Sequence, residues 1–377
     1  MKIFIGIDFA KEKFDAAMIP ADHTKGNTVE YCVFENNDKG VREMLKWIKS
    51  SYPKTTREDL VFCGENTGVY SKPVAEYLSD KGYKISIENA YRIKQSSGLI
   101  RGKNDRKDAA IIADYILRHE DEAAEYKADK PVLKNLDVLF KQRRFLVKQA
   151  SEMKCKLESL DFESGRMDEL KASLDKYCII KGRKLTLKFD KLASLGLVDT
   201  AVVECLAMLK IYEWQTDELD RKMKETIEED EGVKENFDII TSIPGVALQN
   251  AVAMILCTDN FERFGFDARK LACYYGVAVF GKESGSSVYA PPHTSHLANK
   301  QLKSLLTQAA IVSVTHCKPI RAYYSRLIAK GKKKQVVLNN VKNKLLHMIM
   351  SMVRHKTKYD EDAYGKSAKM YNTQISA

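Results

Sequence analysis

The sequence lacks the features that define several common protein classes. No two of its eight cysteines form a C-x-x-C pair, which argues against a zinc ribbon or a redox motif. No stretch approaches the roughly 18 apolar residues that a membrane-spanning helix needs. Charged residues from Asp8 onward interrupt the first apolar run, so we expect no signal peptide, no membrane partner and a reducing compartment.

The composition favours a polyanionic partner. The 377 residues carry a net charge of +11, and 44% of them are hydrophobic, which is ordinary for a protein with a real core. This length predicts two or three domains. Nucleic acid is the first candidate partner for such a positive charge, although simple solubility would explain the charge equally well.

A short apolar run near the start, residues 3–8, ends in a single carboxylate. The run is rich in β-formers and predicts a buried central strand with Asp8 at its end. A buried carboxylate needs a partner. Glu65, Asp105 and Asp108 lie where a mixed α/β fold can bring them to Asp8, so we interpret the four as a metal site.

The first 128 residues alternate strand and helix patterns. The short connection after the first strand predicts a hairpin, and hence a partly antiparallel sheet. The order of three strands, helix, strand, helix, strand and helix suits a ribonuclease H-like, or RuvC-like, fold. The expected strands are 3–8, 14–19, 29–34, 60–63 and 83–87, and the expected helices are 39–51, 69–81 and 104–119.

A basic, glycine-containing stretch, residues 90–104, precedes the last of these helices, and we interpret it as a loop. Asn104 is a suitable N-cap. Asp105 and Asp108 are three residues apart and therefore share a helix face. Acids in a first turn also favour the helix dipole, so two ordinary first-turn acids are the competing interpretation.

The remaining segments predict helical structure. Residues 129–235 carry a heptad seam interrupted by Arg143, followed by a second long helix, which predicts either an internal antiparallel hairpin or an intermolecular coiled coil. Residues 236–357 predict a compact helical unit containing a Pro-Gly turn at 243–246 and a polar loop at 281–287. Residues 358–377 form a polar tail.

Five short motifs of the sequence resemble those of the DEDD transposases of bacterial insertion sequences, the bridge-RNA-guided recombinases. The resemblance covers most of the chain. Its motifs are Ile5-Gly6-Ile7-Asp8, Gly64-Glu65-Asn66-Thr67-Gly68, Lys103-Asn104-Asp105-Arg106-Lys107-Asp108-Ala109, Ile243-Pro244-Gly245-Val246 and Tyr275-Gly276-Val277.

The resemblance implies a DNA recombinase with two catalytic parts. Asp8, Glu65, Asp105 and Asp108 would be catalytic and would bind Mg²⁺, with Mn²⁺ as a substitute. Two such ions about 3.5–4 Å apart activate the attacking oxygen and steady the leaving oxygen of a phosphodiester. Ser284 would be the covalent nucleophile, although Glu283 departs from the family pattern, and the rivals are Ser286, Ser287 and Tyr289.

The resemblance also implies partners. We expect DNA, a structured guide (bridge) RNA and a homo-oligomer, dimer or tetramer, whose composite site takes carboxylates from one subunit and serine from another. The compartment would be the bacterial cytoplasm, near the nucleoid. The candidate nucleic-acid contacts are Arg101, Lys103, Arg106, Lys107, Lys332, Lys333 and Lys334, each of which is equally readable as solvated surface.

Three alternatives remain open from the residues. The first strand and its aspartate also open actin-like ATPases, although these follow the aspartate with a Gly and Ser/Thr phosphate loop where this chain has Phe9-Ala10-Lys11. A nucleic-acid scaffold would use the acids only for solubility and capping. A RuvC-like nuclease would cut with activated water and form no covalent intermediate.

Overall fold

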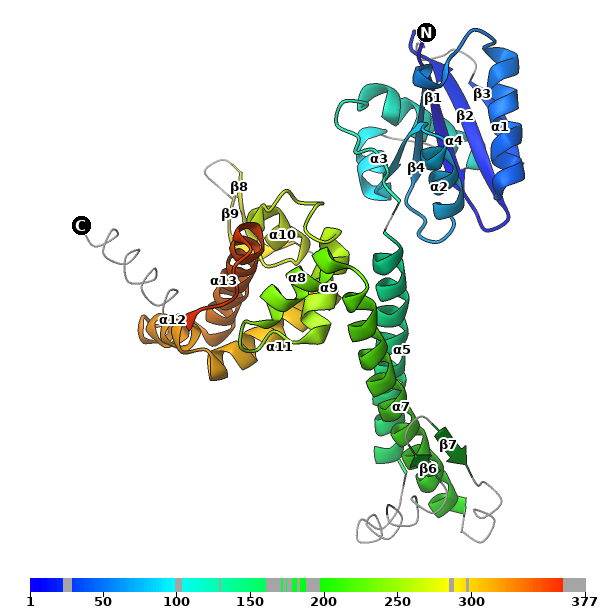
Figure 1. The fold of residues 1–377 in the computed structure, drawn as a ribbon. Coiled ribbons are helices and arrows are strands. Elements are labelled where there is room, and N and C mark those ends of the chain that lie inside the picture. The colour runs from blue at the N-terminus through cyan, green and yellow to red at the C-terminus, as the bar shows by residue number, and fades with distance from the viewer. Residues whose placement is uncertain are drawn as a thin grey trace, which may run out of the picture. The chain divides into compact units, whose positions relative to one another are not determined.

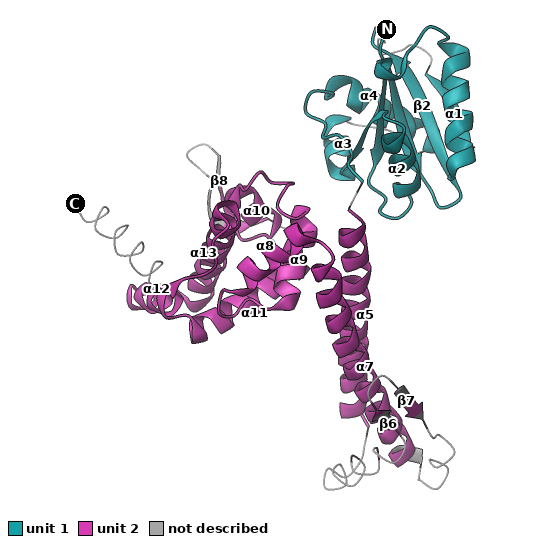
Figure 2. Cartoon of the chain, viewed as in Figure 1, with its two compact units in different colours: residues 1–129 teal, residues 130–377 magenta. Residues whose placement is uncertain are grey.

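The structure is a computed structural model that describes most of the chain. It covers residues 1–22, 29–98, 104–128, 130–160, 171, 174, 178–181, 184–187, 197–284, 288–295 and 298–361. The chain divides into two compact units, residues 1–129 and residues 130–377 (Figure 2).

The first unit is built on a five-stranded mixed sheet with the order β3-β2-β1-β4-β5 (Figure 1). β1 pairs antiparallel with β2, and β2 with β3, whereas β1–β4 and β4–β5 are parallel. The predicted hairpin and mixed sheet are therefore confirmed. The strands are β1 Ile3–Phe9, β2 Lys13–Pro20, β3 Glu30–Glu35, β4 Leu60–Glu65 and β5 Lys84–Glu88.

Helices cover both faces of this sheet. Ile3, Ile5 and Ile7 pack with α1 and α2, whereas Phe4 packs with α4 on the opposite face. This alternation follows from the two-residue period of a strand. The helices of the unit are α1 Asp38–Ser51, the 3₁₀ turn η1 Arg57–Asp59, α2 Lys72–Asp80, α3 Ala90–Ser96 and α4 Asp105–Arg118.

The close approach of α4 to β1 depends on Gly6. A Cβ at this position would overlap the carbonyl oxygen of Ala109 and the amide nitrogen of Ala113, both in the backbone of α4. Only a residue without a side chain allows this packing, and the nearby Asp8 and the start of α4 are brought together by it.

The second unit begins with two long helices, α5 Pro131–Glu158 and α7 Leu197–Glu228, which pack against each other within the chain (Figure 1). Residues near the start of α5 share a core with the end of α7, and Leu157 packs near the start of α7, so the pair is antiparallel. Arg143, the predicted interruption of the seam, forms a two-pronged ion pair with Asp220 of α7 at 2.6 and 3.0 Å. The charge is thus neutralised inside the helical pair.

The rest of the second unit is mostly helical around a shared apolar core. Its helices are α8 Glu231–Thr241, α9 Leu248–Thr258, α10 Ala268–Tyr274, α11 Lys300–His316, α12 Lys318–Ala329 and α13 Lys334–His355. Two short hairpins complete the unit, β6 Cys178–Lys181 with β7 Lys184–Leu187, and β8 Val279–Ser284 with β9 Val288–Thr294.

Two predicted loops contain regular structure. Residues 90–96 form helix α3, which begins at the N-cap Asn89, whose side chain accepts from the amide of Tyr91. Residues 281–284 belong to β8 rather than to a loop, because they pair with β9. Both stretches are rich in polar residues, which is also typical of loops, so the sequence did not predict these elements.

In the described part of the chain, no helix is both long and apolar enough to cross a membrane. All eight cysteines lie within that part of the chain, and they form no disulfide there.

We predict that Gly6→Ala destabilises the first unit. The added methyl group overlaps the backbone of α4, and overpacking of this kind costs about 1–3 kcal/mol of the free energy of unfolding or more. Urea unfolding measures the effect. Gly281→Ala is the control, because its added Cβ meets nothing within 4 Å. Equal losses in the two variants would contradict the packing argument.

Candidate carboxylate site

Strand periodicity places three acids on the face of the sheet that α4 covers. Phe4 and Val61 pack against α4, so Asp8 and Glu65, each an even number of residues further along the same strands, face the same side. Both acids lie at the carboxyl ends of parallel strands. Asp15 joins them, because it lies directly opposite Asp8 in the β1–β2 pairing.

The first turn of α4 supplies the other two acids. Asn104 caps this helix, and its side-chain oxygen accepts from the amide of Lys107 at 2.8 Å, as the sequence predicted. Asp105 and Asp108 both lie in that turn, one helical turn apart. The contact of α4 with β1 at Gly6 holds this turn near the end of the strand.

The other three predicted acids act electrostatically on Asp8. Its pKa is raised to about 6, first by burial and then by the negative charges of Asp108, Glu65, Asp105 and Asp15, in that order. A carboxylate whose negative neighbours resist its ionisation lies in a region of excess negative charge. Such a region favours a bound cation.

Asp15 is a site residue that the sequence analysis missed. It is only 2% exposed, accepts from the hydroxyl group of Tyr31, and lies 3.2 Å from the ammonium group of Lys13. The sequence placed Asp15 on the second strand without assigning it a face. The hairpin register was the available signal, because a short turn after Phe9 pairs Asp8 with Asp15.

Lys13 is the resident counter-charge of the site. Its ammonium group donates to Asp105 at 3.0 Å while contacting Asp15, so it bridges an exposed acid on α4 and a buried acid on β2. The hydrogen bonds to Asp105 and Asp15 raise the pKa of Lys13. A cation that enters between these carboxylates must compete with this ammonium group.

The donor chemistry of the site fits a divalent metal. Carboxylate oxygens are the ligands that Mg²⁺ prefers, and three or four of them with several waters suffice. Within the residues described by the structure, however, no three His, Cys, Asp or Glu side chains lie close enough together to form a ready metal cluster. The acids are therefore close enough to influence one another electrostatically, but their side chains do not surround a single point.

A further acid on the same sheet face has a different role. Glu88 pairs with Glu65 in the β4–β5 register and is only 6% exposed. Arg92, in the first turn of α3, lies 3.3 Å from its carboxylate. The ion pair offsets the charge of Glu88, whereas the acids that raise the pKa of Asp8 are Asp108, Glu65, Asp105 and Asp15.

The predicted nucleic-acid contacts lie in several places. Arg106 lies over the ring of Tyr31, 5.6 Å from its centre, at the edge of the carboxylate site. Lys107 is exposed in the first turn of α4. Lys332 and Lys333 are exposed between α12 and α13, and Lys334 begins α13. Arg101 and Lys103 lie outside the described residues.

Ser284, the predicted nucleophile, is the last residue of β8. Its backbone pairs with Val288 of β9, while Tyr289, the rival candidate, pairs with Glu283. The hairpin thus places both candidates near its tip. Ser286 and Ser287 fall outside the described part of the chain.

Comparison with known proteins identifies the family. Residues 5–160 match the DEDD transposases of the IS110 type, and residues 237–325 match the transposase family IS116/IS110/IS902. The chain belongs to this family of transposases. The first match includes all four predicted acids, and the second includes Ser284.

Two relatives extend this likeness over nearly the whole length of the transposase. Pilin gene-inverting proteins of Moraxella bovis and Moraxella lacunata are each 26% identical to it over 364 residues. The alignments cover 96% of this chain and 98% of each relative. Both units of the chain therefore have counterparts in these proteins.

We predict that Asp8→Asn changes the pH dependence of stability in chelator-treated protein. Because the folded pKa of Asp8 is about 6, above the ordinary 3.8, the folded state binds this proton more tightly than the unfolded state. The ionised group therefore opposes folding as the pH rises through that range. Wild type should lose up to about 1–2 kcal/mol relative to Asp8→Asn between about pH 4 and about pH 7, after allowance for solvent screening.

Urea unfolding at a series of pH values measures this difference. Asp121→Asn removes an exposed acid of the same unit and serves as the control. Parallel pH profiles for wild type and Asp8→Asn would show that Asp8 does not carry the raised pKa.

Proposed function

We propose that this transposase is an insertion-sequence recombinase that cuts and rejoins DNA strands through a divalent-metal carboxylate site and a covalent serine–DNA intermediate. The observation that carries the proposal is the convergence of Asp108, Glu65 and Asp105 on Asp8, whose pKa they raise. Family membership supports DNA recombination as the activity. The pilin gene-inverting relatives support it further, since inverting a gene requires breaking and joining DNA.

We assign the first unit to the RNase H-like, RuvC-like fold. The strand order β3-β2-β1-β4-β5, with three antiparallel strands followed by two parallel ones, supports this assignment. We also propose functional boundaries at residues 1–128 for the RuvC-like domain, 129–235 for the helical linker, 236–357 for the serine-bearing domain and 358–377 for the tail.

Asp8, Glu65, Asp105 and Asp108 are the residues that we propose hold the metal, with Mg²⁺ as the physiological ion and Mn²⁺ as a substitute. When bound, the ions would activate the attacking oxygen and steady the leaving oxygen of the phosphodiester. The chain's own contribution is to hold the acids on a rigid sheet and helix start. Lys13 offsets the charge of Asp105, and of the neighbouring Asp15, before the cation binds.

Ser284 is the proposed nucleophile. Its hydroxyl oxygen bonds to phosphorus, the bond between phosphorus and the deoxyribose oxygen breaks, the serine proton passes to solvent, and the departing sugar oxygen takes up a proton. A sugar hydroxyl of another strand then reverses these steps and releases the serine. Strand joining by this route conserves the phosphodiester bond energy and needs no added energy source.

The basic side chains extend the proposal to nucleic-acid binding. Arg106 and Lys107 lie between the two acids in the first turn of α4, where phosphates would lie, and Arg101 and Lys103 precede this turn in the sequence. Lys332, Lys333 and Lys334 would grip a backbone elsewhere. By resemblance, a structured guide RNA and a dimer or tetramer complete the active complex.

The closest rival function is a RuvC-like nuclease that uses the same acids with activated water. Family membership favours transposition over the actin-like ATPase and over a non-catalytic scaffold. The experiments below separate the recombinase from the nuclease and test the metal site independently of activity.

We predict that Asp8→Asn removes most Mn²⁺ binding measured by electron paramagnetic resonance, because it removes the ligand on which the other charges converge. Lys13→Gln should instead strengthen Mn²⁺ binding about two- to tenfold, since the competing ammonium group is gone. Lys11→Gln removes the same charge from an exposed position in the same turn and is the matched control. Unchanged binding in Asp8→Asn would exclude this metal site.

We predict that a labelled DNA junction incubated with Mg²⁺ gives a protein–DNA adduct that survives denaturation and is absent in Ser284→Ala. A covalent phosphoserine resists denaturants, whereas a complex held by contacts alone does not. Ser286→Ala is the matched control and should still form the adduct. Nicked DNA without an adduct would establish the nuclease instead, and an adduct in Ser284→Ala would move the nucleophile to Ser286, Ser287 or Tyr289.

A further inference from the structure

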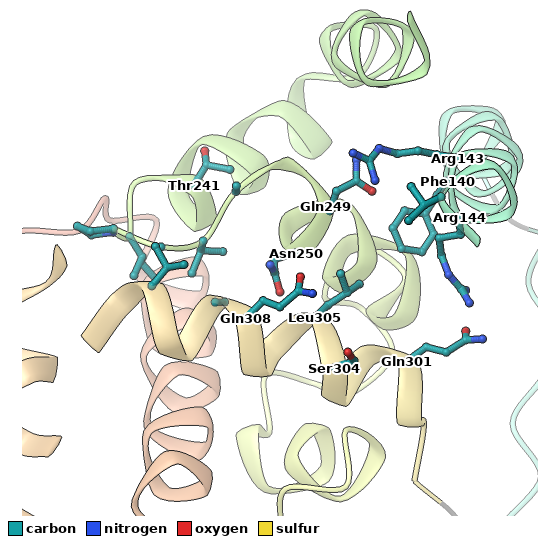
Figure 3. Close-up of a pocket in the computed structure, with 18 of the residues that line it drawn as sticks. Phe140, Arg143, Arg144, Thr241, Gln249, Asn250, Gln301, Ser304, Leu305 and Gln308 are labelled. Carbon is teal, nitrogen blue, oxygen red and sulfur yellow. The ribbon is translucent and has the colours of Figure 1, made fainter. Parts of the chain in front are cut away.

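A groove in the second unit has no role in the proposed chemistry. Its volume is about 980 Å³, and it lies between α5, the turn at residues 243–247 with the start of α9, and α11 (Figure 3). All three walls belong to one compact unit. The groove is therefore a feature of the folded unit itself.

The turn that forms one wall is fixed by direct contacts. Gly245 has a φ of 98°, and a Cβ at this position would lie 2.5 Å from the amide nitrogen and the hydroxyl oxygen of Ser313. The same hydroxyl group donates to the carbonyl oxygen of Pro244 at 2.7 Å. The turn is thus held against α11, and the groove is formed before any ligand arrives.

The charge of the groove has one sign. Arg143, Arg144 and Lys148 line it from α5, and none of its lining residues is acidic. Arg143 is neutralised by Asp220, and Lys148 lies 3.6 Å from Glu152. Arg144 lies over the ring of Phe140 and, among the described residues, has no carboxylate partner, so it is the cation available to an anionic ligand.

Uncharged polar side chains line the wall that α11 forms, opposite α5. Gln301, Ser304 and Gln308 occur at spacings of three and four along α11 and so form one stripe. Asn250 of α9 lies on a facing wall, and Arg144 points into the opening between α5 and α11 (Figure 3). Within the described chain, the side chains of Asn250, Gln301 and Gln308 make no hydrogen bond, so their amides are free to bind a ligand.

Most of the remaining lining is apolar, with Pro244, Val147 and Leu305 among its members. Apolar surface accommodates the face of a nucleobase, amides can both donate to and accept from its edge, and a guanidinium group binds the phosphate. A site that binds only the backbone of a duplex needs cations and hydrogen-bond donors, but it needs no apolar surface. The combination fits an unpaired nucleotide better than a paired one.

We propose that this groove binds an unpaired DNA strand, with a base against the apolar wall and a phosphate on Arg144. DNA is the occupant that the family assignment supports, and the positive charge of the groove complements the negative charge of DNA. The inference rests on the proposed function in one respect, because breaking and exchanging strands is what makes unpaired DNA available. It adds to that function a place where the loose strand is held.

Binding of three fluorescein-labelled probes to the full chain tests the proposal by fluorescence anisotropy. The probes are a mixed-sequence single-stranded DNA, its duplex and the RNA of the same sequence. Arg144→Gln should weaken single-stranded DNA binding about five- to tenfold and Gln308→Ala about two- to fivefold, with little change for the duplex. Lys141→Gln is the matched control, because Lys141 is exposed one turn before on α5 and lies outside the groove.

Three outcomes would overturn the proposal: equal effects in Arg144→Gln and Lys141→Gln, an equal loss of duplex binding, or a loss confined to RNA. Photocrosslinking of a 4-thiothymidine strand adds a readout that does not depend on a variant. The crosslinked peptides should contain residues 243–250 or 301–312, and crosslinks solely elsewhere would place the strand outside the groove. The adduct assay keeps this inference distinct from the proposed function. If wild type forms no adduct but its binding of single-stranded DNA still depends on Arg144, the recombinase proposal is refuted and the groove proposal stands.

Discussion

The direct contact between helix α4 and strand β1 is the constraint on which the candidate site depends. Gly6 allows the two backbones to touch, since any side chain there would overlap the backbone of α4. Asp8 follows two residues later on the same sheet face, and the acidic first turn begins α4. Acids that are about a hundred residues apart in sequence therefore share one charge field because a single position carries no Cβ. Packing, rather than any bond between the acids, holds the site together.

That packing creates an electrostatic cost that the protein offsets locally. Burial and four neighbouring carboxylates raise the pKa of Asp8, and the same concentration of negative charge would weaken the fold if nothing balanced it. Two cationic side chains offset this negative charge, one on each side of the site. Glu88 pairs with Arg92, whose guanidinium group also contacts Glu122, whereas Asp15 and Asp105 share the single ammonium group of Lys13. A flexible ammonium group can leave when a stronger cation arrives, which a structural pair such as Glu88–Arg92 does less readily.

Much of this arrangement could be predicted from local sequence patterns. The alternation of apolar residues in β1, the N-cap Asn104 and the three-residue spacing of Asp105 and Asp108 are short-range signals, and the structure bears out the elements they predict. Asp15 and Lys13 escaped notice because their importance comes from cross-strand register, which a strand pattern does not assign to a face. Helix α3 and the end of β8 escaped notice because polar, glycine-containing stretches also suit loops. The ion-pair partner of Arg143 could not be predicted from local patterns either, because Asp220 lies 77 residues away in the sequence.

The Arg143–Asp220 pair also explains how the long helices and the groove are related. A charged residue in a heptad seam would normally weaken the packing of α5 on α7, yet here it is satisfied by two hydrogen bonds and Gln249 of α9 donates to the same carboxylate at 2.6 Å. Three segments of the second unit thus meet at one acid. Because Arg143 is committed to this junction, it anchors the groove wall without contributing net charge to it. The adjacent Arg144, turned toward the opening, is left as the cation for a ligand, so adjacent arginines on one helix have separate structural and binding roles.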